Sequence, residues 1–169
     1  RDITLNRGDV VQLLSRTHDG GTNTDLCETL GGRGGDAEGS PTCFDDAGGD
    51  LTGSVVTADA DVAVWAGHTC SFMPVDSYAC DHLEEMMFPR ATLGDLLVMT
   101  APDHPSRSGQ APAVYRVMSA IDNNFITFTP STVAFDRTVN AGEFIEFTTD
   151  TDFVVLASGA VHVTQSLVG

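Results

Sequence analysis

Hydrophobic and polar residues alternate along most of the chain with the period of two that is typical of β-strands. The clearest runs lie at 10–14, 62–65, 113–118, 125–128, 144–147 and 153–156. Turn-forming residues separate them, and the best helical candidate, 82–87, is short. The pattern predicts an all-β, antiparallel, sandwich-like fold with little or no helix. The single tryptophan, Trp65, ends one of the runs and is expected in the core.

Two parts of the chain repeat each other. Residues 4–13 read TLNRGDVVQL and residues 138–147 read TVNAGEFIEF. Farther along, residues 55–64 (VVTADADVAV) match residues 154–163 (VVLASGAVHV). Self-similarity of this kind indicates a duplicated β unit. The first pair is separated by 138 − 4 = 134 positions and the second by 154 − 55 = 99, so the first copy contains an insertion of 134 − 99 = 35 residues.

These offsets define the expected organisation of a single β domain built from two related units. The first repeat covers about 1–67, a connecting segment covers 68–112, and the second repeat covers about 113–169. The insertion, at about 16–50, is rich in Gly, Asp and Thr and is expected to form an exposed loop. Loops on rigid scaffolds often carry binding residues, so this loop is a candidate for recognition.

The second repeat is preceded by a hairpin that the first repeat lacks. Its predicted strands, 113–118 and 125–128, are joined through a turn at 122–124. An unpaired β edge exposes backbone hydrogen-bonding groups and part of a core. We therefore expect the chain to be a fragment of a larger protein, in which upstream sequence or a neighbouring molecule fills the gap.

Charge narrows the classes of partner. The 169 residues include 24 acidic and 8 basic side chains, all of the latter arginine, for a net charge of −16. Such a surface repels phosphate backbones and anionic lipids, which argues against nucleic acid as a partner. No apolar run approaches the length needed to cross a bilayer, so no membrane insertion is expected.

Four cysteines, Cys27, Cys43, Cys70 and Cys80, suit two disulfides in a secreted protein. Four cysteines allow three connectivities. Pairing Cys27 with Cys43 and Cys70 with Cys80 is the simplest, because each bond then closes one loop. We expect a disulfide-stabilised extracellular domain.

A polar cluster flanks the last two cysteines and consists of His68, Asp81, His82, Glu84 and Glu85. The mirrored His-x-Cys and Cys-x-His strings allow a zinc site, since both residue types bind zinc. Their spacing is tighter than usual, and oxidised thiols do not bind metal. We favour structural histidines beside a disulfide, hydrogen-bonded to Glu84 or Glu85. The remote alternative is a metal-dependent enzyme centred on His68, His82 and Glu84.

A calcium site is the weaker candidate for a cofactor. Asp19, Asn23 and Asp25 offer alternating oxygen ligands. They lack the spacing and the terminal bidentate glutamate of an EF-hand loop. No nucleophile elbow and no defensible carboxylate pair for glycoside hydrolysis occurs in the sequence. We therefore expect no catalytic residues and no cofactor other than calcium.

Several strings outside the insertion are distinctive: DLTGS at 50–54, VAVWAGHTC at 62–70, CDHLEE at 80–85 and the two Asn-x-Gly-Asp/Glu turns. They resemble the N-terminal domain family of IgGFc-binding protein, which occurs in animal mucus proteins and in bacterial secreted or surface proteins. The CDHLEE string is the most specific part of the resemblance. It implies a secreted, non-enzymatic binding or adhesion module, here of the bacterial type.

We interpret the chain as an extracellular interaction or adhesion module that presents loops, chiefly 16–50 and 71–79, on a β scaffold. Its expected partner is an extracellular protein or a glycan. The alternative is a self-assembling structural subunit of an extracellular fibre or sheath. In that case a strand from a neighbouring copy would complete the unpaired edge.

Overall fold

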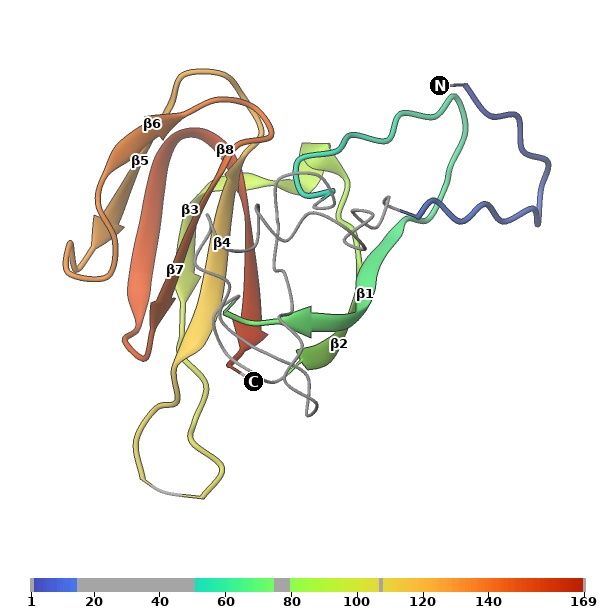
Figure 1. Cartoon of the computed structure of the whole chain (residues 1–169). Coiled ribbons are helices and arrows are strands. Elements are labelled where there is room, and N and C mark those ends of the chain that lie inside the picture. Colours follow the sequence, from blue (N-terminus) through green and yellow to red (C-terminus); the bar gives the residue numbers. More distant parts are fainter. Residues whose placement is uncertain (1, 15–50, 75–79, 107, 169) are drawn as a thin grey trace, which may run out of the picture. The chain divides into compact units, whose positions relative to one another are not determined.

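The computed structural model describes residues 2–14, 51–74, 80–106 and 108–168 (Figure 1). The chain divides into two units, Arg1–Leu51 and Thr52–Gly169, and the boundary between them lies inside the first repeat. The residues that fall outside the described part include Cys27, Cys43 and the calcium candidates Asp19, Asn23 and Asp25.

The described strands all lie in the second unit. They are β1 (Trp65–Phe72), β2 (Cys80–Met86), β3 (Gly94–Met99), β4 (Ala113–Ser119), β5 (Asn124–Thr129), β6 (Arg137–Val139), β7 (Phe144–Thr149) and β8 (Phe153–Leu167). Every pairing is antiparallel. The only helix among the described residues is the 3-10 turn η1 (Arg90–Thr92), and no helix found there is long and apolar enough to cross a bilayer. The predicted all-β, antiparallel fold is confirmed, and the helical candidate 82–87 lies mostly in β2.

Strand β8 organises the larger sheet (Figure 1). Its first part pairs with β5 on one side and β3 on the other, while its second part pairs with β4, which also pairs with β7. Gly159 lies between the two parts. A Cβ there would come within 2.2 Å of the Ile121 Cδ1 atom, so a glycine allows this close approach.

The core is built from the inward-facing residues of β4, β5, β7 and β8. Tyr115, Phe128, Phe147 and Phe153 form its aromatic centre. The Phe153 ring meets the Tyr115 ring edge-on at 4.8 Å and the Phe147 ring at 5.3 Å between centroids. Aromatic pairs prefer such tilted contacts, which add to the free energy of burying the rings. The predicted runs 113–118, 125–128, 144–147 and 153–156 all lie in these strands.

The two Asn-x-Gly turns, at 6–9 and 140–143, have the same structure. In each, the acidic residue's backbone N–H donates to the asparagine carbonyl at 3.0 Å. Its carboxylate accepts from the asparagine backbone N–H, at 2.9 Å in the first turn and 2.7 Å in the second. Gly8 has φ 92° and Gly142 has φ 83°, as the third residue of a type II turn requires. The two copies of the sequence repeat therefore share the structure of this turn, and the duplicated β unit stays a prediction.

The first repeat nevertheless forms no strand at 10–14, and of the predicted run 62–65 only Trp65 lies in a strand, so these two predictions are wrong. Val10 and Leu14 are 91% and 80% exposed. Trp65 begins β1 but is 60% exposed, so its expected place in the core is also wrong. The matching segments of the second repeat are β7 and β8, which pair with β4. A period of two gives a stable strand only where a partner strand accepts its hydrogen bonds.

His162 makes the fold sensitive to acid. It is half-buried in β8, with its ring 6.4 Å from that of Phe88, and burial lowers its pKa below the ordinary value of 6.5. The unfolded chain therefore takes up a proton before the folded chain does. The stabilisation from neutral His162 is present above about pH 6.5 and is lost as the pH falls from there through the folded-state pKa.

The variant His162→Gln should lose less thermal stability than the parent when the pH is lowered from 7 to 5. Thermal unfolding checks this, with the exposed His82→Gln as control, and equal losses in the parent and His162→Gln would contradict it.

Candidate binding surface

The predicted polar cluster lies on the β1–β2 hairpin. His68 on β1 pairs with Leu83 on β2. Because successive strand residues point to opposite faces, His68 shares a face with Leu83, and His82 and Glu84 share the other. His82 Nε2 lies 3.4 Å from Glu84 Oε2, and both side chains are 64% exposed. The hairpin therefore brings His82 and Glu84 together and places His68 on the opposite face.

The remaining acidic members of the cluster, Asp81 and Glu85, alternate with His82 and Glu84 along β2. Glu85 Oε1 accepts a hydrogen bond from the backbone N–H of Met86 at 3.2 Å. Within the described part of the chain, no group of three or more His, Cys, Asp or Glu residues is arranged to hold a metal ion. The geometry of the hairpin gives no support to a shared metal site at His68, His82 and Glu84.

The hairpin also positions two of the cysteines. Cys70 lies near the end of β1, and Cys80 begins β2, where it pairs with Phe72. The backbone thus brings Cys70 and Cys80 to the same end of the hairpin. Pairing of these two cysteines in a disulfide remains a prediction, as does pairing of Cys27 with Cys43.

An apolar surface that the sequence did not predict covers part of the outer side of the larger sheet, on β3, β5 and the first part of β8. We call it the β3–β8 face, and it consists of Leu96, Val98, Phe125, Thr127, Val154 and Leu156. Leu96 pairs with Leu156, and Val98 pairs with Val154, so the two rows are continuous. Thr127 extends the first row, because it pairs with Leu156 from the other side. The face contains no charged side chain, although the chain carries a net charge of −16.

The exposure of this face is high for apolar side chains. Leu96 is 61% exposed, Val98 73%, Leu156 53% and Phe125 49%. The intervening residues of β3, Leu97 and Met99, pack against the core instead. The sequence signal was the apolar run LLVM at 96–99, but a run that is apolar at every position does not reveal which residues face outward. The register with β8 reveals it.

Strand β3 also forms an edge of the sheet. Among the described strands it pairs with β8 alone. An edge strand presents backbone N–H and C=O groups that a further strand can bind. The β3–β8 face and this edge adjoin, so one partner can bury apolar side chains and pair with backbone groups together.

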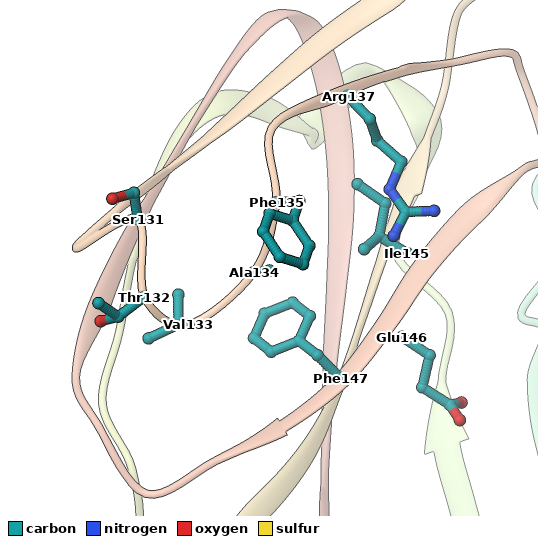
Figure 2. A pocket seen from close by; sticks show the side chains of 9 residues that line it. All are labelled: Ser131, Thr132, Val133, Ala134, Phe135, Arg137, Ile145, Glu146 and Phe147. Carbon is teal, nitrogen blue, oxygen red and sulfur yellow. The ribbon is translucent and has the colours of Figure 1, made fainter.

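A second accessible apolar feature is a hollow of about 530 Å³ between the 131–135 loop and β7 (Figure 2). Phe147 lines it, and the Phe147 ring also stacks on the Tyr115 ring at 5.8 Å between centroids. Figure 2 shows the Phe135 ring above Phe147, and Phe135 is 84% exposed. Arg137 supplies a positive charge at the rim, while the Glu146 carboxylate is paired with Arg116.

Comparisons with known proteins identify a family for this β-rich chain. The family model described as IgGFc binding protein matches residues 1–169. The IgGFc-binding protein of Homo sapiens is 27% identical over 120 residues, which are 71% of this chain. The match spans only 2% of the length of that human protein. No solved structure matches the chain. The chain belongs to the IgGFc binding protein family.

Proposed function

We propose that the chain is a secreted, non-enzymatic module that binds extracellular proteins. Family membership supports a binding role, and the name of the human relative refers to binding of the IgG Fc region. The even number of cysteines supports an oxidising, extracellular environment. The observation that carries the proposal is the charge-free β3–β8 face on a strongly acidic chain.

The β3–β8 face has the properties of a protein-binding surface. Contiguous exposed apolar patches on soluble proteins commonly mark interaction sites. The side chains project from paired strands, so binding requires little additional ordering of the backbone. Negative charge elsewhere on the chain disfavours acidic partners and favours partners with a neutral or basic rim. Adhesion to a protein-coated surface is the use that we propose for such a site.

Replacing Leu96 and Val98 together by glutamate should weaken partner binding at least tenfold and leave thermal stability within a few degrees of the parent. Burying one such side chain contributes about 1.5–3 kcal/mol, and a tenfold loss of affinity corresponds to about 1.4 kcal/mol. The measurement is surface plasmon resonance on the immobilised chain. Human IgG Fc fragment is the first probe, followed by an array of secreted proteins and glycans.

The double variant Thr148→Glu/Thr151→Glu is the matched control, because it adds the same charge at exposed positions on and beside β7. It should bind as the parent does. Deleting residues 20–49 tests the alternative that the insertion carries recognition. Loss of binding in the deletion variant but not in Leu96→Glu/Val98→Glu would contradict a site on the β3–β8 face.

The second candidate is a self-assembling structural subunit of an extracellular fibre or sheath. The unpaired edge of β3 favours it, because a strand from a neighbouring copy can extend a sheet at such an edge. Size-exclusion chromatography and electron microscopy over a concentration series distinguish the two functions. A fibre subunit forms ordered polymers in the absence of any other protein, whereas a binding module does not.

A further inference from the structure

The extended segment 55–63 in the second unit has the sequence of a strand but pairs with none of the described strands. Figure 1 draws it without an arrow, in teal. Within the described part of the chain, no hydrogen bond is found along it. Val55, Val56 and Val62 are 70%, 58% and 55% exposed. Several apolar side chains of one segment are therefore left in water.

Both ends of this segment are nevertheless held in place. Before it, the hydroxyl of Thr52 accepts a hydrogen bond from Arg116 Nη1 at 3.0 Å. Gly53 packs so closely on Gly142 that a Cβ on Gly53 would lie 2.3 Å from the Gly142 carbonyl oxygen. After the segment, the carbonyl of Val64 accepts from the backbone N–H of Met87 at 2.8 Å. A segment fixed at both ends loses less conformational entropy when a strand pairs with it.

The second repeat shows what the matching segment looks like when it is paired. Val56 corresponds to Val155, and Val62 corresponds to Val161. Val155 and Val161 are 0% and 1% exposed in β8. Between them, both segments carry small residues on the same face, Ala58 and Ala60 in the first repeat and Ala157 and Gly159 in the second. The first repeat thus keeps the residue pattern of the inward face, but these side chains are not buried as they are in β8.

The hairpin of β4 and β5 provides the burial in the second repeat. Phe128 and Ile126 on β5 pair with Val155 and Ala157, and Ser119 at the end of β4 pairs with Val161. The large inward side chains of the hairpin, Tyr115 and Phe128 among them, fill the space that the small residues of β8 leave. A small-residue strand of this kind needs a partner with large apolar side chains.

We propose that segment 55–63 is an acceptor for a β-hairpin of the β4–β5 type, supplied by an additional repeat unit. The occupant carries large aliphatic and aromatic residues at alternate positions. Basic outward-facing residues suit it, since the acceptor's outward residues include Asp59 and Asp61. The β4–β5 hairpin of a second folded copy is buried in its own core, so the donor is a further hairpin. Pairing would complete the first repeat.

A peptide of residues 111–130 (APAVYRVMSAIDNNFITFTP) is the probe. Titrated into the intact chain, it should bind at a ratio of one to one. At saturation it should slow amide hydrogen exchange in 55–63 at least tenfold, as measured by mass spectrometry. The same peptide with Tyr115→Glu and Val117→Glu, at two inward positions, should neither bind nor protect.

Chain variants locate the site within the segment. Val56→Asp changes an inward position and should abolish both binding and protection. Val55→Asp makes the same change at the adjacent outward position and should leave binding within about threefold of the parent, because the outward face does not contact the donor's apolar side chains. Leu96→Glu/Val98→Glu should bind the peptide as the parent does, which separates this acceptor from the β3–β8 face.

Three results would overturn the proposal. The first is no protection of 55–63 at about 1 mM peptide, a concentration that corresponds to only about −4.1 kcal/mol of binding free energy. The second is slowed hydrogen exchange in other strands only. Protection of β3 alone would mean that the peptide binds at the edge of the sheet, and protection of β7 and β8 alone would mean that it replaces β4 and β5 in the second repeat. The third is equal binding of the peptide by Val55→Asp and Val56→Asp.

A linked variant avoids aggregation of the free peptide. In it, the 111–130 hairpin is joined to the N-terminus of the chain by a flexible linker. The melting temperature should then rise by several degrees, unless Val56→Asp is present.

Discussion

Replacing Asn124 by alanine should destabilise the second unit by about 3 kcal/mol, since removing one partner leaves several buried polar groups unpaired. The Asn124 side chain is completely buried. Its Nδ2 donates to Ser119 Oγ at 3.0 Å and to the Gly159 carbonyl at 3.1 Å. Its Oδ1 accepts from the Gly159 backbone N–H at 2.9 Å and from Ser158 Oγ at 3.1 Å. The Asn124 side chain therefore connects the start of β5 to the part of β8 that lies between its pairing with β5 and its pairing with β4.

Urea unfolding followed by circular dichroism measures the effect of Asn124→Ala. The neighbouring Asn123→Gly is the control, because Asn123 is exposed and has φ 54°, a conformation that glycine adopts easily. It should change the free energy of unfolding by less than about 1 kcal/mol. If Asn124→Ala were as stable as Asn123→Gly, the buried network would not hold the β5–β8 junction.

Phe153→Ala should have the largest effect on stability, about 4 kcal/mol, because it removes a buried ring and leaves a cavity. Phe153 is 2% exposed and contacts Tyr115 and Phe147 ring to ring. Such a loss can exceed half of the total stability of an ordinary domain, so partial unfolding at 37 °C is expected. The free energy of unfolding and the near-ultraviolet circular dichroism of the tyrosine measure it.

Phe125→Ala is the matched control, since it makes the same substitution at a residue that is 49% exposed. It should cost about 1 kcal/mol or less. Because Phe125 belongs to the β3–β8 face, this variant should instead weaken partner binding. A stability loss at Phe125 equal to that at Phe153 would show that the β3–β8 face is covered in the native protein, which contradicts the proposed site.

Much of the second repeat could be predicted from its sequence. The period of two in 113–118, 125–128 and 144–147 identified β4, β5 and β7, because alternation reflects a strand with one buried face. The two Asn-x-Gly turns were recognisable because their geometry is local. A glycine at the position of positive φ and an acidic residue one place later suffice to form the turn.

The candidate sites were less predictable. Sequence proximity suggested one polar cluster, but the β1–β2 register places His68 on the face opposite to His82 and Glu84. The β3–β8 face was missed because its rows join residues of β3, β5 and β8 that lie about 30 to 60 positions apart in the chain. Neither result is encoded in a short window, because a shift of one residue in register reverses the face of every side chain in a strand.

The sequence by itself determined the all-β class, the shapes of the two Asn-x-Gly turns and the strongly negative net charge. These properties depend on period, backbone preference and charge, which are local or additive. Only the tertiary structure decided which strand patterns become strands. Segments 55–63 and 154–163 have nearly the same pattern, yet only the second lies in a sheet, because β4 and β5 pair with it. Strand formation depends on a partner's hydrogen bonds and apolar contacts, so the same pattern is a core strand in one repeat and an exposed segment in the other.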